Sequence, residues 1–179
     1  MEEEFDFGSP EEQKKFVNRF EEMIRNEDQY FFDANTFESI IDFYSDKNDS
    51  IKALQVIEFA TSQHPYEAGF FAKKAQILSL MRQFSLALEA IEKAESLEPS
   101  DSDILLIKAS IYASQGMFDT SEELFNQALE NAENKAEIYH QLATIYQMQA
   151  NFSKAKDFLK KSLKISVDNP DALLELNFC

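Results

Sequence analysis

The sequence predicts an all-α protein built from repeated pairs of helices, on the basis of two observations. First, only 3 Gly and 4 Pro occur among 179 residues, too few turn residues for a β-sandwich or a Gly-rich phosphate-binding fold. Second, apolar and small residues recur with a constant period. The hydrophobic share of 44%, with 17 Phe, supplies a core and argues against a disordered chain. At this length one domain with a sizeable core is expected.

The period is 34 residues, with units starting at 34, 68, 102, 136 and 170. Six places within the unit repeat the same kind of residue. The fourth, eighth and eleventh places are mainly large or apolar, and the twentieth and twenty-seventh are Ala or Ser. In order of place, the residues are Phe37, Phe71, Leu105, Tyr139 and Leu173; Ile41, Ala75, Ala109 and Ala143; Tyr44, Leu78, Tyr112 and Tyr146; Ala53, Ala87, Ser121 and Ala155; Ile57, Ile91, Phe125 and Leu159; and Ala60, Ala94, Ala128 and Ser162.

These spacings predict two helices in each unit. Places four, eight and eleven lie on one helical face, and places twenty, twenty-four and twenty-seven lie on a second. The small residues allow the two backbones to approach to roughly 8–10 Å. Short polar or Gly-containing runs at 45–50, 81–83, 114–116 and 148–151 are the predicted turns.

The segment before the repeats is predicted to hold a capping helix. Residues 1–8 are an acidic tail, and residues 9–33 contain the helix and its connector. Ser9 and Glu12 have the spacing of a capping box, and Pro10 suits the first helical position. Apolar residues then follow at helical spacing, so we expect the helix to cover the first repeat. They are Phe16, Phe20, Met23 and Ile24.

The pattern resembles the tetratricopeptide repeat family, a 34-residue helix–turn–helix with W-x2-L-G-x2-Y, A-x3-F and P. The likeness covers residues 34–67, 68–101, 102–135 and 136–169, and residues 170–179 resemble the opening of a fifth repeat. Several family residues differ: Phe, Leu or Tyr replaces Trp, Ile or Ala replaces Gly, and Lys74 and Lys108 stand at the leucine place. Pro65 and Pro99 close the first two repeats, but Glu133 and Val167 close the others. The resemblance implies a right-handed superhelical solenoid.

By the same resemblance, the first helix of each pair lines a concave groove that binds a peptide or helix of a partner protein. Mapped onto this sequence, the expected lining is acidic at one end and then small, polar and neutral. Gln76 and His140 offer hydrogen-bonding groups to a ligand backbone. The expected peptide-binding residues are Glu38, Asp42, Ala72, Gln76, Leu80, Leu106, Ser110, Ser114, His140 and Thr144.

Charge narrows the class of partner. The formal net charge is −16, from 33 acidic and 17 basic residues, which disfavours nucleic acid and anionic membrane surfaces. A neutral or basic protein or peptide is expected instead. The beginning of the sequence lacks the pattern of a secretory signal, and Cys179 is the only cysteine, so no intrachain disulfide is possible. We therefore expect a cytoplasmic protein.

Motifs for catalysis, metal or cofactor binding are missing from the sequence. It contains neither H-E-x-x-H, C-x-x-C, a phosphate-binding loop nor G-x-S-x-G, so no catalytic residue, cofactor or metal is expected. An enzyme remains the third hypothesis.

Family members that bind a chaperone's acidic C-terminal tail use a clamp of Lys, Asn and Arg, and Glu38 and Asp42 at those places argue against such a ligand. The lysine-rich run 154–164 is interpreted as a solvated face, and docking of an acidic partner there is the minor alternative.

The last residues of the sequence suggest the main alternative function. Residues 170–179 resemble part of an opening helix without its second helix, and terminal repeats are expected to be polar outward. Truncation of a longer array is the preferred interpretation. The alternative is a structural unit that forms homo-oligomers through Leu173, Leu174, Leu176 and Phe178.

Overall fold

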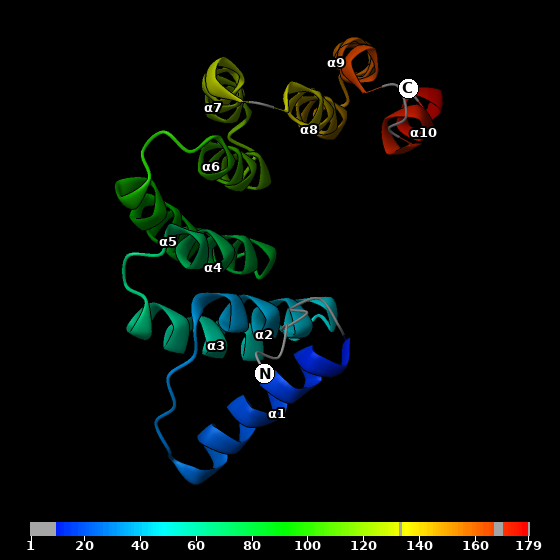
Figure 1. Cartoon of the computed structure of the whole chain (residues 1–179). Coiled ribbons are helices and arrows are strands. Elements are labelled where there is room, and N and C mark those ends of the chain that lie inside the picture. The colour runs from blue at the N-terminus through cyan, green and yellow to red at the C-terminus, as the bar shows by residue number, and fades with distance from the viewer. Residues whose placement is uncertain (1–9, 133, 167–169, 179) are drawn as a thin grey trace. The chain divides into compact units, whose positions relative to one another are not determined.

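The computed structural model describes residues 10–132, 134–166 and 170–178, and the described residues form helices and turns without a strand. The prediction of an all-α fold is therefore confirmed. The acidic tail 1–8 and Ser9 of the expected capping box lie outside the described residues. Figure 1 labels the helices α1 Pro10–Asn26, α2 Ala34–Asp46, α3 Ser50–Gln63, α4 Ala68–Leu80, α5 Phe84–Leu97, α6 Ser102–Ser114, α7 Phe118–Asn131, α8 Lys135–Met148, α9 Phe152–Ile165 and α10 Pro170–Phe178.

The chain divides into two compact units between α5 and α6. Unit 1 is Met1–Leu97 and unit 2 is Glu98–Cys179. In both units successive helices pack as antiparallel pairs, α2 with α3 and α4 with α5 in unit 1, and α6 with α7 and α8 with α9 in unit 2. We call α2, α4, α6, α8 and α10 the first helices, and α3, α5, α7 and α9 the second helices.

The core of unit 1 is rich in aromatic residues. Phe37 is fully buried, with its ring 5.4 Å from that of Phe32 and 6.2 Å from that of Phe70. Helix α1 packs against α2 and buries Phe20 and Met23 in the same core, together with Val17. The amphipathic pattern of residues 10–26 thus places an apolar face over the first helix pair.

The core of unit 2 is mainly aliphatic. Phe125 of α7 packs with Leu142 and Ile138 of α8, and all three are almost fully buried. Helix α10 packs against α9, where Ala172 joins Leu159 in a smaller cluster. Each helix in the unit therefore buries a stripe against its neighbours.

Small residues at the twentieth and twenty-seventh places are fully buried wherever they occur: Ala53, Ala60, Ala87, Ala94, Ser121, Ala128, Ala155 and Ser162 each have 0% exposure. Where serine replaces alanine, its hydroxyl donates to a first-helix carbonyl. Ser121 Oγ donates to Ala109 O and Ser162 Oγ donates to Ala136 O, both at 2.8 Å. The two polar groups are thereby satisfied inside the core.

The buried face of the first helices is wider than the sequence indicated. Phe37 at the fourth place is fully buried, but Phe71 and Tyr139 at the same place are only partly buried. The preceding third place is deeper, since Phe70 has 0% exposure and Ile138 has 1%. The physical reason is that α4 and α8 each contact a second helix on both sides, so the buried arc of the helix covers more than one stripe.

The ends of the helices follow local backbone rules. The chain turns out of α2, α4, α6 and α8 through a residue of positive φ: Asn48 (56°), Arg82 (59°), Gly116 (79°) and Ala150 (56°). These four positions are 34 residues apart, so the same turn occurs in each repeat. N-cap side chains start α3 and α9: Asp49 accepts from Lys52 N at 3.1 Å, and Asn151 accepts from Lys154 N at 3.2 Å.

Candidate functional site

The exposed sides of α2 and α4 form the first-helix face of unit 1. Asp42 and Gln76 are exposed and Glu38 is partly exposed. Leu80, at the end of α4, is 82% exposed. Ala72 is different, because it is only 8% exposed and contributes to the floor beneath these side chains.

Lys73 belongs to this face and was missed by the sequence analysis. Its Nζ lies 2.6 Å from Asp42 Oδ1, and the two side chains are 29% and 55% exposed. The ion pair joins α4 to α2 and neutralises part of the predicted acidic end. The two residues lie on different helices, so helical spacing within the sequence gives no signal for this pair.

The first-helix face of unit 2 contains hydroxyls that bond to their own helices. Ser110, Ser114 and Thr144 are all exposed. Ser110 Oγ donates to Leu106 O at 2.9 Å, Ser114 Oγ to Ser110 O at 2.9 Å, and Thr144 Oγ1 to His140 O at 3.2 Å. Leu106 itself is only 9% exposed and packs in the core of unit 2. These contacts leave a surface of methyl, methylene and acceptor groups.

His140 faces a carboxylate on α10 that the sequence analysis did not identify. His140 Nε2 lies 3.2 Å from Glu175 Oε1 without the alignment of a hydrogen bond, and Gln147 Nε2 donates to Glu175 Oε2 at 3.2 Å. The side chains of His140 and Glu175 are 17% and 33% exposed. The two first helices α8 and α10 are therefore joined by polar groups, and His140 is already opposite a partner within the chain.

The leucines expected to form an oligomer surface differ in how far their side chains are exposed. Leu173 is 46% exposed and Leu174 is 59% exposed. Leu176 is partly buried against the cluster that contains Ala143 and Leu159. The side chain of Phe178 lies outside the described residues.

The other histidine has a structural position in unit 1. His64 Nε2 lies 2.8 Å from Phe32 O, and the ring packs 5.3 Å from that of Phe31 and 6.0 Å from that of Phe70.

In the part of the chain that the structure describes, no group of three or more His, Cys, Asp or Glu residues is arranged to hold a metal ion. None of the described helices is long and apolar enough to cross a membrane.

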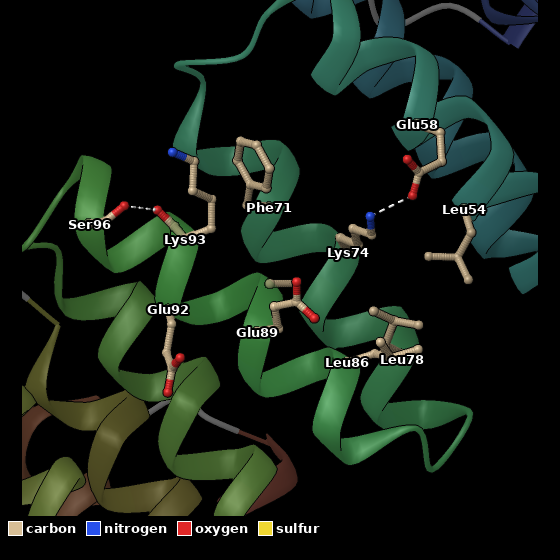
Figure 2. Close-up of a pocket in the computed structure, with 11 residues that line it drawn as sticks. Leu54, Glu58, Phe71, Lys74, Leu78, Leu86, Glu89, Glu92, Lys93 and Ser96 are labelled. Atoms are coloured by element: carbon tan, nitrogen blue, oxygen red, sulfur yellow. Dashed lines mark hydrogen bonds and ion pairs between the residues drawn. The ribbon is translucent and has the colours of Figure 1, made fainter.

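A hollow of about 740 Å³ lies between α3, α4 and α5 of unit 1, and we call it the second-helix hollow. Figure 2 shows Leu54 of α3, Leu78 of α4 and Leu86 of α5 among its lining residues. Lys74 of α4 forms an ion pair with Glu58 of α3 at the rim. The remaining lining residues are Phe71, Glu89, Ala90, Glu92, Lys93 and Ser96. The 34-residue pattern did not indicate this hollow.

One repeat earlier, the equivalent space holds a polar network. Tyr44 Oη donates to Glu21 Oε1 at 2.9 Å, and Lys52 Nζ donates to the same oxygen at 2.8 Å. The Lys52 ammonium also lies 5.1 Å from the centre of the Tyr44 ring. The hydrogen bonds from Lys52 and Tyr44 lower the pKa of Glu21, whereas burial and the bond to Glu21 raise the pKa of Tyr44.

Unit 2 repeats this arrangement in α8 and α9. Lys154 Nζ donates to Tyr146 Oη at 3.2 Å and lies 4.6 Å from the centre of the Tyr146 ring. Burial, followed by a hydrogen bond to Glu122 of α7, raises the pKa of Tyr146. Tyr146 and Lys154 are 102 residues after Tyr44 and Lys52, which corresponds to three repeats of 34 residues.

Comparison with known proteins identifies the repeat. A family model of the tetratricopeptide repeat matches residues 101–166. A comparison with curated protein sequences gave no significant match.

Solved structures resemble most of the chain. A thermophilic TPR protein of Thermus thermophilus is 19% identical with a TM-score of 0.76, over 93% of this chain and 90% of that chain. The pilF protein of Pseudomonas aeruginosa is 14% identical with a TM-score of 0.68, over 92% of this chain and 67% of that chain. YrrB, a TPR protein with an unusual peptide-binding site, is 20% identical with a TM-score of 0.65, over 91% of this chain and 82% of that chain. Residues 101–166 therefore contain the tetratricopeptide repeat by their sequence, and most of the chain shares the fold of solved tetratricopeptide-repeat structures.

Proposed function

We propose that the chain is a non-catalytic scaffold that binds a peptide or helix of a partner protein on its first-helix faces. Tetratricopeptide repeats are generally protein-interaction scaffolds, and stacked helical repeats commonly use the surface of their first helices for binding. YrrB is described as having a peptide-binding site, which supports the same role for a chain of this fold.

The observation that carries the proposal is the bonding of the exposed hydroxyls in unit 2. Burying a polar group without a partner costs about 1–3 kcal/mol. Ser110, Ser114 and Thr144 already donate to carbonyls of their own helices. A ligand that covers them leaves none of these three donors unpaired, and their small side chains leave room for its backbone.

Charge supports a neutral or basic partner. The chain carries a net charge of −16, and Glu38 and Asp42 lie on the first-helix face of unit 1. Long-range attraction of a basic segment raises its association rate, and this effect decreases as salt is added.

The test compares two double variants by capture from native lysate and mass spectrometry. Gln76→Arg with Ser110→Arg places two long cations on the first-helix faces. Ser62→Arg with Gln127→Arg is the matched control, because it makes the same changes at exposed positions of second helices. Partners captured by the wild type should be lost only with the first pair. Identical partner lists from both variants would disprove binding on the first-helix faces.

A second candidate function is self-assembly through α10, and the exposure of Leu173 and Leu174 favours it. In this case the mass in sedimentation equilibrium should rise with concentration. Leu174→Glu should restore the monomer mass, whereas Ile51→Glu should not, since Ile51 is 75% exposed on α3. A monomer at all concentrations for the wild type would exclude this candidate.

A further inference from the structure

The second-helix hollow of unit 1 is an open version of a space that another repeat fills with polar side chains. A shift of 34 residues relates Phe20 to Leu54, Tyr44 to Leu78 and Lys52 to Leu86. Phe20, Tyr44 and Lys52 line a hollow of about 170 Å³, whereas the leucines belong to the hollow of about 740 Å³. The repeat therefore retains the position of the hollow but loses the groups that bridge it.

The bridge depends on a lysine that leucine cannot replace. Lys52 reaches from α3 across the Tyr44 ring to Glu21 of α1, a contact that joins three helices. Leu86 stands at the corresponding place on α5, and it is 50% exposed. Because a leucine side chain forms no hydrogen bond to the neighbouring helices, Leu86 does not bridge the space, and the hollow stays open with apolar side chains along its side.

The rim of the hollow adds a preference for charge. Glu58 is paired with Lys74, and further around the rim lie Glu89, Glu92 and Lys93, so the five charged lining residues sum to −1. Glu89 and Glu92 are exposed on α5. The whole chain carries −16, which attracts cationic ligands over a longer distance.

We propose that the second-helix hollow binds a basic amphipathic helix of a partner protein. A large apolar side chain of that helix inserts among Leu54, Leu78 and Leu86, and a Lys or Arg one turn away pairs with Glu89. The volume is that of a small-molecule pocket, roughly 300–1,000 Å³, which is ample for one side chain of the partner. An amphipathic helix in a hydrophobic groove presents its anchors at this one-turn spacing. The site is separate from the first-helix faces and does not depend on the function proposed for them.

The test uses a fluorescein-labelled synthetic helix with leucines on one face and lysines on its flanks, in fluorescence anisotropy with the intact chain. Two control peptides are a scrambled sequence of the same composition and a version with glutamate in place of lysine. We expect the wild type to bind the first peptide more tightly than either control. Equal binding of the scrambled peptide, preferred binding of the glutamate version, or no binding of the lysine helix would overturn the proposal.

Variants of the chain test the position of the site. Leu86→Lys introduces the residue found at the equivalent place in α3, and it should weaken binding of the lysine helix by roughly tenfold or more. Ile51→Lys is the matched control, because it makes the same change at an exposed apolar residue of α3 outside the hollow, and it should change the affinity by less than about twofold. Circular dichroism checks that both variants are folded. Equal losses in the two variants would overturn the proposal.

Two further variants separate this site from the first-helix faces. Glu89→Gln should weaken binding and reduce its dependence on salt, because it removes one rim charge. Gln76→Arg with Ser110→Arg should leave the affinity for the lysine helix unchanged. A loss of affinity in that double variant would assign the peptide to the first-helix faces and refute binding in the hollow.

Discussion

Replacing Ala128 with Leu should destabilise unit 2, because the contact between helices has no room for a larger side chain. Ala128 has 0% exposure and belongs to the cluster that contains Leu106 of α6, Phe125 of α7 and Ile138 of α8. Leucine adds three heavy atoms at a point where these helices meet. Such overpacking costs about 1–3 kcal/mol, since neighbouring side chains leave their preferred rotamers or the helices separate.

The matched control is Gln127→Leu, one residue earlier in α7. Gln127 is exposed, so the same leucine there should change the free energy of unfolding by no more than about 0.5 kcal/mol. In a domain of about the size of unit 2, each kcal/mol corresponds to a decrease in Tm of roughly 4–8 °C. Thermal melts followed by far-ultraviolet circular dichroism measure both variants. Equal melting temperatures would refute the packing argument and the alignment of the repeat.

Three other outcomes follow from local geometry. Ala150→Gly should stabilise the chain by about 0.5–1 kcal/mol, because φ is +56° at this position and glycine adopts that conformation without strain. A urea titration measures the change, and an unchanged or lower midpoint would contradict this expectation. Ser162→Ala should cost about 0.5–1.5 kcal/mol by removing the hydrogen bond to Ala136 O, and an unchanged free energy of unfolding would mean that the bond contributes nothing. Glu21→Gln tests the effect of pH. The pKa of Glu21 is lowered, so its carboxylate stabilises the folded chain above pH 4.5, the ordinary pKa of this group. This stability is lost as pH falls through the lower folded-state pKa, so the difference in stability between the variant and wild type should shrink in acid. A difference that persists in acid would exclude the charge of the carboxylate as its cause.

Residues that pack within one repeat were predictable from the sequence. Ala87 and Ala94 recur with Ala53 and Ala60 at a spacing of 34, and a small residue at such a place marks close contact between helices. The contact is made by residues near one another along the chain. Periodicity therefore contains the information that the fold of a single helix pair requires.

The candidate site was predictable only in part. The sequence placed Asp42 and Gln76 on an exposed face, but it did not indicate that Lys73 pairs with Asp42. It named His140 as a ligand-binding residue without the Glu175 carboxylate that faces it. Both partners come from a different helix, and their distances depend on how successive first helices are placed.

The second-helix hollow illustrates the same limit. The change from Tyr44 and Lys52 to Leu78 and Leu86 is visible in the 34-residue frame. Its consequence depends on the tertiary structure, because a polar network fills the space beside α1, whereas the space between α3 and α5 stays open. An exchange of polar for apolar residues at two places thus changes the shape of a surface.

The sequence by itself determined that this protein is helical, that its helices pair every 34 residues, and that its surface is strongly acidic. These properties depend on composition and on contacts between residues close together in the chain. Only the tertiary structure decided which residues of the candidate site already have partners, such as Asp42 and His140, and where apolar side chains leave open space. Those features arise between different helices, and the positions of side chains there follow from packing between repeats.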